Sequence, residues 1–210
     1  MILSHQHKFI FVAIPKTATH AIRVALRPHL GSQEWEQCRL FVDKRFPIPS
    51  IARLRHGHIT CMQLQQALPE RLYSPYFKFC IVRNPYDRFV SYCYFLYGKS
   101  WRMKLFPKHT MKRIFQNPKT PRHILFRPQH EFVSDEAGAL LVDKIGRYES
   151  LQSDFDAICQ RLGLPKQPLP MPNASRHPPY QQCYDQELQE MVQAFYRRDF
   201  ELFDYPIGIA

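Results

Sequence analysis

Two apolar runs, each followed by a turn with proline and then by a helical pattern, organise the first half of the chain. Residues 9–14 read Phe-Ile-Phe-Val-Ala-Ile, and residues 77–82 read Phe-Lys-Phe-Cys-Ile-Val. Short, almost continuous apolar runs are typical of parallel strands that are buried on both faces. Pro15 follows the first run, Pro85 lies shortly after the second, and in both cases an amphipathic helical pattern resumes within a few residues. The sequence therefore predicts two strand–turn–helix units.

The rest of the chain adds one more strand and further helices. Alternating Leu, Val and Ile predict a third strand over 140–145, and Ser150 is placed to cap the helix that follows it. A proline-rich loop is expected over 165–180, and a last helix over 185–203. Because strands alternate with helices, we expect a single α/β domain over residues 1–210, with a central, mainly parallel sheet flanked by helices.

The charge balance is the compositional feature that bears most on function. Lys and Arg number 29 against 18 Asp and Glu, which gives a formal net charge of +11 at pH 7. Such a charge implies anionic partners, among them nucleic acid. However, the basic residues are scattered and form no recognisable nucleic-acid-binding module, so we expect no nucleic-acid partner. A polyanionic cofactor together with an acidic acceptor accounts for the charge equally well.

Targeting signals and cysteine usage both point to the cytoplasm. The chain contains no run of the ~18–20 apolar residues that a membrane span requires. Residues 1–14 lack the basic region, long apolar core and cleavage site of a signal peptide. The six cysteines show neither a CxxC pair nor a metal-type spacing, so reduced thiols in the core are expected rather than disulfides. The oligomeric state is not indicated by the sequence.

The first candidate site is the turn after the first strand, where residues 14–20 read Ile-Pro-Lys-Thr-Ala-Thr-His. A turn from strand to helix presents backbone N–H groups and the positive end of a helix dipole to an anion. Lys16 adds a mobile charge, and Thr17 and Thr19 add hydroxyl donors. The glycines of a Walker A loop are absent. The alternative interpretation is an ordinary turn with a surface lysine.

The second candidate site follows the second strand, where residues 81–92 read Ile-Val-Arg-Asn-Pro-Tyr-Asp-Arg-Phe-Val-Ser-Tyr. Arg83 ends the strand, so it is expected at the carboxyl edge of the sheet, where α/β proteins bind their ligands. Its forked guanidinium suits a phosphate dianion. Ser91 lies in the helix that follows. Arg88 is expected to form a salt bridge, with Asp87 or with another nearby acid.

Together these two segments resemble the sulfotransferases that depend on 3′-phosphoadenosine 5′-phosphosulfate (PAPS). Residues 15–19 are similar to the 5′-phosphosulfate-binding loop of that family, and residues 83–92 to its 3′-phosphate-binding strand and helix. The resemblance is closest to the Golgi carbohydrate sulfotransferases, in particular the uronyl 2-O-sulfotransferases of heparan and dermatan sulfate. It extends from residue 9 to 205 and includes His56-Gly57-His58, residues 146–149 and residues 173–180.

The resemblance implies a P-loop-kinase-like three-layer fold, PAPS as donor with PAP as its product, and no required metal. The acceptor would be a hydroxyl of a carbohydrate or glycoconjugate, which itself could be anionic. The membrane anchor and most of the extra length of the Golgi enzymes are absent from this sequence, which leaves a polymeric acceptor in question. Residues implied at the 5′-phosphosulfate are Pro15, Lys16, Thr17, Ala18, Thr19 and His20; those implied at the 3′-phosphate are Arg83 and Ser91, with Arg176 as a further nucleotide contact.

Catalysis of sulfuryl transfer needs a positioned acceptor, a base for its proton and a positive charge at the leaving group. The resemblance implies that Lys16 lies at the bridging oxygen and that His58 is the base. An imidazole with an ordinary pKa of ~6.5 suits this role at neutral pH. His56 is the alternative base or orients the acceptor, and a carboxylate is a third possibility. No Cys or His is spaced to complete a zinc site with the two histidines.

Two other functions are compatible with parts of this pattern. A P-loop kinase for a small molecule would use Thr17 and a Walker B acid, for which Asp143 is the available residue. A non-catalytic nucleotide- or polyanion-binding protein of the same fold would not need an acceptor-side base such as His58. The basic stretch 99–127, which is interspersed with aromatic residues, is either an acceptor platform or a solvated surface.

Overall fold

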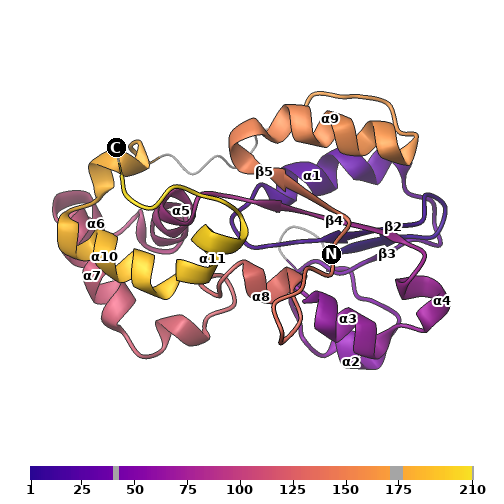
Figure 1. Cartoon of the computed structure of the whole chain (residues 1–210), viewed down its shortest axis with the longest axis horizontal. Helices are drawn as coiled ribbons and strands as arrows, with labels where there is room; N and C mark the ends of the chain where they lie inside the picture. The colour runs from indigo at the N-terminus through magenta and orange to yellow at the C-terminus, as the bar shows by residue number, and fades with distance from the viewer. Residues whose placement is uncertain (40–42, 171–176, 210) are drawn as a thin grey trace. The chain divides into compact units, whose positions relative to one another are not determined.

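The computed structural model describes residues 1–39, 43–170 and 177–209 of the chain (Figure 1). The chain forms two compact units, each made of two segments. The first unit comprises Met1–Val82 and Gln129–Pro172, and the second comprises Arg83–Pro128 and Asn173–Ala210. Each unit has its own elements and its own site residues, and each is described by itself.

The first unit is built on a five-stranded sheet with the order β3-β1-β2-β4-β5. The strands β2, β4 and β5 are parallel to one another, and β1 pairs antiparallel with β2 and with β3. An α/β fold with a sheet flanked by helices is therefore confirmed, but the parallel pairing holds only for these three strands. The strands are β1 (Ile2–Ser4), β2 (Phe9–Val12), β3 (Trp35–Glu36), β4 (Phe77–Val82) and β5 (Lys144–Arg147).

Helices cover both faces of this sheet (Figure 1). On one face, alternate strand residues such as Phe11 and Phe79 pack against Ile22 of α1 (Thr19–Leu26) and Phe155 of α9 (Leu151–Leu162). This alternation follows from the period of two along a strand. The helices on the other side of the sheet are α2 (Pro49–Ala52), α3 (Cys61–Ala67), α4 (Glu70–Tyr73) and α8 (His130–Val133).

The second unit is helical among its described residues, and its core is aromatic. Its first helix was expected after a turn that contains Pro85, and it begins at Pro85 itself, because the Asn84 side chain accepts a hydrogen bond from the Tyr86 amide at 2.9 Å and Pro85 occupies the first helical position. In the core, the Tyr196 hydroxyl donates to the Phe126 carbonyl at 2.6 Å. The α-helices are α5 (Pro85–Tyr97), α6 (Trp101–Leu105), α7 (Pro107–Gln116), α10 (Gln186–Phe195) and α11 (Arg197–Leu202).

Two predicted elements differ from the structure. The third strand was expected over 140–145, but β5 begins at Lys144 and Leu140 is 42% exposed. β5 is an edge strand, and an edge strand needs less apolar sequence than the alternating run that suggested 140–145. The last helix was expected as one element over 185–203, but it divides at Tyr196, whose φ of −99° and ψ of 17° leave the helical range.

All six cysteines lie in the described part of the chain; each is buried and carries a free thiol. Burial raises the pKa of the Cys80 and Cys93 thiols well above the ordinary value. These thiols therefore behave as small apolar core groups, as the sequence indicated. Within residues 1–39, 43–170 and 177–209, no helix has the length and apolar character needed to cross a bilayer.

Candidate functional site

The loop between β2 and α1 has an unusual backbone for a segment without glycine. Lys16 has a φ of 66° and Ala18 a φ of 62°, so two non-glycine residues within three positions are left-handed. Each such residue costs roughly 1–2 kcal/mol, and conformations of this kind concentrate at ligand-binding sites. The Thr17 side chain is fully buried, and its hydroxyl donates to the Ile14 carbonyl at 2.9 Å. The Thr17 hydroxyl therefore holds the loop in shape.

The loop leads directly into the N-terminus of α1. Ala18 is the N-cap residue; no side chain among the described residues caps this end, and the first turn contains no acidic residue. The first amides of any helix lack acceptors inside the helix, and the helix dipole is positive there. Burial, and then the positive charges of Arg27 and Arg23, lower the pKa of His20. His20 is therefore neutral at pH 7 and can offer a hydrogen bond to an anion, but not a charge.

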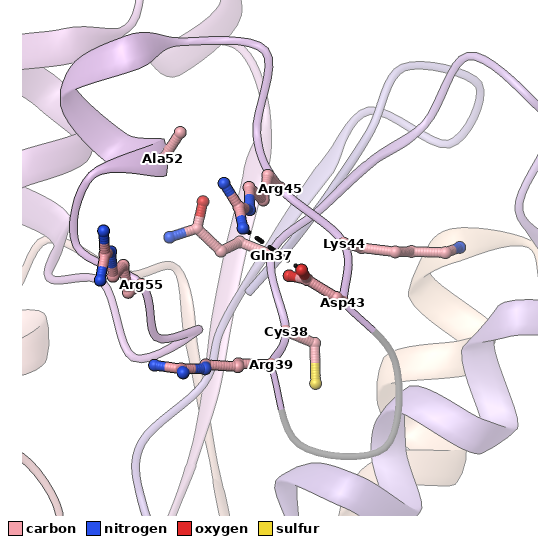
Figure 2. A pocket seen from close by; sticks show the side chains of 8 residues that line it. All are labelled: Gln37, Cys38, Arg39, Asp43, Lys44, Arg45, Ala52 and Arg55. Atoms are coloured by element: carbon pink, nitrogen blue, oxygen red, sulfur yellow. Dashed lines mark hydrogen bonds and ion pairs between the residues drawn. The ribbon is translucent and has the colours of Figure 1, made fainter.

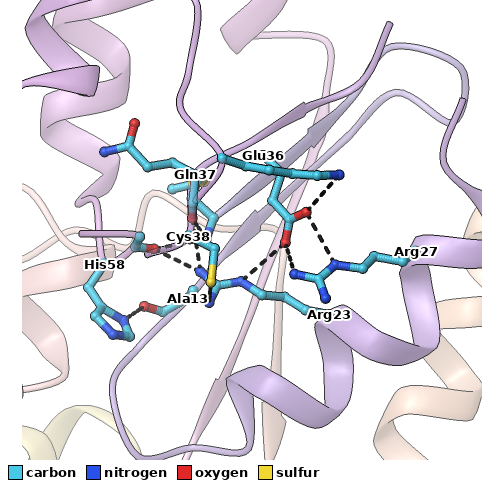
Figure 3. A network of polar contacts seen from close by, with 10 residues as sticks. Ala13, Arg23, Arg27, Glu36, Gln37, Cys38 and His58 are labelled. Atoms are coloured by element: carbon cyan, nitrogen blue, oxygen red, sulfur yellow. Dashed lines mark hydrogen bonds and ion pairs between the residues drawn. The ribbon is translucent and has the colours of Figure 1, made fainter. Parts of the chain in front are cut away.

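The His58 ring lies against the strand that carries this loop. Its Nδ1 atom is 2.7 Å from the carbonyl oxygen of Ala13, the residue after β2 (Figure 3). Because a carbonyl only accepts, the proton of the neutral ring is on Nδ1, and Nε2 has the free lone pair. Burial is the largest influence on the ring and lowers the pKa of His58 to about 3, with Arg23 adding to the effect. His58 is thus neutral at pH 7 and can accept a proton on Nε2.

The second candidate base, His56, has a different setting. Its ring centroid lies 6.4 Å from that of His58. The backbone carbonyl of His56 accepts a hydrogen bond from the Gln37 side-chain amide at 2.9 Å. The hydrogen bond to the end of β2 is made by the His58 ring.

Gly57 permits a close packing of Arg23, which lies on α1, against the backbone of residues 37 and 57. One Arg23 terminal nitrogen donates to the carbonyls of Gln37 and Gly57, each at 3.2 Å, and the other lies 3.2 Å from the Cys38 sulfur. A Cβ atom on residue 57 would lie 2.2 Å from the Gln37 carbonyl oxygen. Only glycine fits here. The helix that begins at the loop is therefore connected to the His-Gly-His segment.

A buried carboxylate balances the charge of Arg23. Glu36 accepts two hydrogen bonds from Arg27, at 2.8 and 3.3 Å, and lies 3.4 Å from the Lys44 ammonium and 3.9 Å from Arg23. Burial alone would raise the pKa of Glu36, but these three cations outweigh it and the net pKa is lowered. Glu36 is thus ionised at pH 7, which allows Arg23 to remain charged although it is buried.

A basic cavity of about 250 Å³ borders the same segment (Figure 2). Asp43 and Arg45 form an ion pair at 3.3 Å. Gln37 and Cys38, which contact His56 and Arg23, form part of its wall. The lining has four cationic side chains, one acidic side chain and three uncharged ones. The lining residues are Gln37, Cys38, Arg39, Asp43, Lys44, Arg45, Ala52 and Arg55.

Sequence reasoning did not identify this cavity. Residues 33–54 contain no periodic pattern that would predict a helix or a strand. The available signal was the density of basic residues from Arg39 to Arg55, immediately before the two histidines. Such a density of basic residues is also typical of a solvated surface, so the sequence alone does not predict a cavity here.

In the second unit, Arg83 and Ser91 are both buried. The Arg83 Nε atom donates to the Asp87 carboxylate at 2.7 Å, and Asp87 lies in the first turn of α5. This ion pair orients the guanidinium. Ser91 lies on α5 and is 1% exposed. The sequence had not indicated Asp87 as part of the site.

Of the two kinds of partner expected for Arg88, a nearby acid other than Asp87 is present, because the charge of Asp199 acts on its guanidinium. Asp87 pairs with Arg83, whereas Arg88 is fully buried and donates to the carbonyls of Arg127 at 2.7 Å and Leu125 at 3.4 Å. Its guanidinium also lies 5.7 Å from the centre of the Tyr196 ring. Arg88 therefore has a structural role, which agrees with the expectation that it is not a phosphate ligand. Arg176 lies outside the described residues.

Topology brings the ends of β2 and β4 to one edge of the sheet. The two strands are parallel neighbours with Val12 opposite Cys80. The loop after β2 and the carboxyl end of β4 consequently lie at the same edge of the sheet. This is the edge where open α/β sheets bind ligands.

Comparison with known proteins gives one match. The model of the sulfotransferase family matches residues 1–206, which is almost the whole chain. Neither the curated protein sequences nor the solved structures contain a significant match. The family match is independent of the geometry described above.

Proposed function

Because the chain belongs to the sulfotransferase family, we propose that it transfers the sulfuryl group of PAPS to a hydroxyl of a carbohydrate or glycoconjugate. The observation that carries this proposal is the contact between His58 and Ala13, which sets a neutral imidazole beside the strand that bears the Lys16 loop. A kinase would require a catalytic metal. A simple binding protein would not require a base at this position.

The residues present fit the donor nucleotide. A strained loop followed by an uncapped, acid-free helix N-terminus suits the 5′-phosphosulfate, and Lys16 supplies the positive charge. The buried Arg83, held by Asp87, suits the 3′-phosphate, with Ser91 as a further donor. When bound, PAPS would supply the sulfuryl group, with PAP as its leaving group.

His58 would remove the proton from the acceptor hydroxyl. The Ala13 carbonyl holds the Nδ1 proton, so the acceptor proton would go to Nε2 and produce an imidazolium. Burial and the charge of Arg23 disfavour this cation, whereas negative charge in the neighbouring loop would favour it. His58 would thus be a stronger base in the ternary complex than in the free protein.

Lys16 would act at the other end of the reaction. Its ammonium would stabilise negative charge that develops on the bridging oxygen of the leaving group. The left-handed backbone at Lys16 and Ala18, together with the buried Thr17 hydroxyl bond, would hold the loop amides in one arrangement before the nucleotide binds. No metal is needed for these steps.

The cavity beside His56 and His58 is the proposed acceptor side. Its cationic lining, which includes Arg39 and Arg55, favours an acceptor that carries a carboxylate or sulfate near the reacting hydroxyl. The side-chain amide of Gln37, which lines the cavity, donates to the backbone carbonyl of His56, two residues before His58.

The experiment that tests the proposal is calorimetric binding of PAP, with ADP and ATP–Mg²⁺ as controls. We expect tight binding of PAP and a large loss with ADP, which lacks the 3′-phosphate. Transfer of label from PAPS to sugar acceptors would then be measured. Preference for ATP–Mg²⁺ would favour a kinase, and absence of binding to all three would refute the assignment.

A further inference from the structure

An apolar surface protrudes from the second unit between the end of α5 and the start of α7. Trp101 is 61% exposed, Leu105 66% and Phe106 57%. The last turn of α5 adds Phe95, Leu96 and Tyr97, which are also exposed. We call these six residues the apolar tip. Solitary exposed apolar side chains are common, but six within twelve residues form a contiguous feature that requires an explanation.

The apolar tip is not a consequence of a poorly formed helix. Trp101 and Leu105 are four residues apart on α6 and therefore share one face. Met103, which lies on the other side of the same helix, is 1% exposed and anchors it to the unit. The Ser100 side chain caps α6 by accepting from the Met103 amide at 3.2 Å. The large apolar groups thus project from a well-anchored helix.

The stretch of sequence that carries the apolar tip has charged residues of one sign. From residue 88 to residue 130 the sequence contains ten Lys and Arg and no Asp or Glu. Lys99, Arg102, Lys104 and Lys108 are all exposed, and the Arg102 guanidinium lies 5.3 Å from the centre of the Trp101 ring. Lys112, farther along α7, is engaged by Asp185 and Glu187. The cations nearest to the tip are the four that alternate with its apolar residues.

We propose that the apolar tip and these four cations bind the surface of an anionic lipid bilayer. Trp, Phe and Leu enter the boundary between headgroups and acyl chains, while Lys and Arg attract anionic lipid headgroups. Nucleic acid would suit the charge, but it offers no apolar phase for Leu96 and Leu105. A protein partner would suit the apolar residues, but it gives no reason for a 43-residue segment without acids. The combination of both features matches a membrane surface.

This inference concerns where the protein works, and it does not depend on the proposed reaction. An enzyme held at a bilayer meets acceptors that are themselves displayed on membranes. The apolar tip lies outside the residues assigned to the donor and to the base, so its loss should leave turnover of a soluble acceptor unchanged.

The test is sedimentation of the full chain with vesicles of phosphatidylcholine alone and of phosphatidylcholine mixed with phosphatidylserine. We expect binding to the mixed vesicles and weak binding to the neutral ones. The double variant W101S/L105S should bind the mixed vesicles at least about tenfold more weakly. The matched control is I207S, because Ile207 is 57% exposed in the same unit but lies beside Glu190 and Glu201.

A second variant separates charge from apolar contact. K99Q/R102Q/K104Q/K108Q should reduce the preference for phosphatidylserine and the sensitivity to salt, and thermal melting of every variant should match the wild type. Equal vesicle binding by W101S/L105S and the wild type would overturn the proposal. The proposal would also be overturned if the wild type did not bind vesicles. In that case, loss of binding to a soluble anionic oligosaccharide in W101S/L105S would assign the tip to an acceptor, and conversion of a dimer to a monomer would assign it to a second copy of the chain.

Discussion

The imidazole of His58 donates its Nδ1 proton to the carbonyl of Ala13 across a distance of 2.7 Å. This single bond joins two segments that are 45 residues apart in sequence. It selects the tautomer in which Nε2 can accept a proton, and it fixes the ring to the strand from which the Lys16 loop emerges. A candidate base and a candidate donor loop are thereby positioned by the same strand end.

Replacement of His58 should remove catalysis without removing nucleotide binding. H58Q retains a side-chain amide that can donate to Ala13 but cannot take a proton at neutral pH. We expect turnover to fall by on the order of 10²-fold or more, with PAP affinity nearly unchanged. H56A is the matched control and should retain more activity. Full turnover by H58Q, measured with labelled PAPS, would assign the base to another residue.

His58 should also make the fold sensitive to acid. Its pKa is about 3 in the folded chain against an ordinary value of ~6.5, so the unfolded chain binds the extra proton between these values. The free energy of unfolding should therefore decrease as pH falls from about 6.5 toward 3, by up to about 1.4 kcal/mol per pH unit from this group. Urea unfolding should show a shallower pH dependence for H58Q than for the wild type. Identical profiles, with the exposed H109Q as reference, would contradict the prediction.

Loss of the Lys16 ammonium should affect the chemical step more than binding. K16A should lower turnover by on the order of 10²-fold, since the charge on the bridging oxygen develops only during the reaction. Alanine adopts the left-handed φ of 66° no more easily than lysine does, so the backbone strain is unchanged in this variant. K16R should recover part of the rate. A change in KM for PAPS with an unaltered kcat would indicate a binding role only.

Arg83 should contribute to the binding of the 3′-phosphate of PAP. R83A should weaken PAP binding by ~2–3 kcal/mol in calorimetry and leave the weaker binding of ADP almost unaltered. D87N should give a smaller loss of PAP affinity, because it removes the carboxylate that orients the Arg83 Nε atom. Equal losses for PAP and ADP would show that Arg83 acts through the fold of the second unit and not through the phosphate.

Arg55 should determine the preference for an anionic acceptor. R55Q should raise KM for a uronate-containing oligosaccharide by about tenfold and leave KM for its carboxyl-reduced, neutral form unchanged. R53Q is the matched control, because Arg53 is exposed two residues away and does not line the cavity. If both variants raised KM equally, the effect would be one of general surface charge.

The parts of the site that were predictable are those encoded in continuous sequence. The turn after the first apolar run, the strand 77–82 and the helix after it were each indicated by an apolar run followed by a proline, and all three occur in the structure. Each depends on interactions within a few residues, so local pattern was sufficient.

The parts that were missed depend on contacts between distant residues. β1 is only three residues long and is followed by a polar turn, so it became visible only through its pairing with β2. Arg23 resembles any surface arginine of an amphipathic helix, and its burial follows from the carbonyls of Gln37 and Gly57. Sequence alone does not show whether Asp87 pairs with Arg83 or with Arg88. The structure shows that it pairs with Arg83, because the Arg88 guanidinium donates to the Arg127 carbonyl instead.

The lack of room for a side chain at position 57 limits how this protein can be redesigned. An exchange of residues 50–58 for the equivalent segment of another enzyme would seem a direct way to change acceptor preference. However, any transplanted segment with a side chain at position 57 would displace the Gln37 carbonyl and the Arg23 guanidinium, and with them the first turns of α1. Changes intended to alter the proposed acceptor preference should therefore be made at Arg45, which lines the cavity, while glycine is retained at position 57.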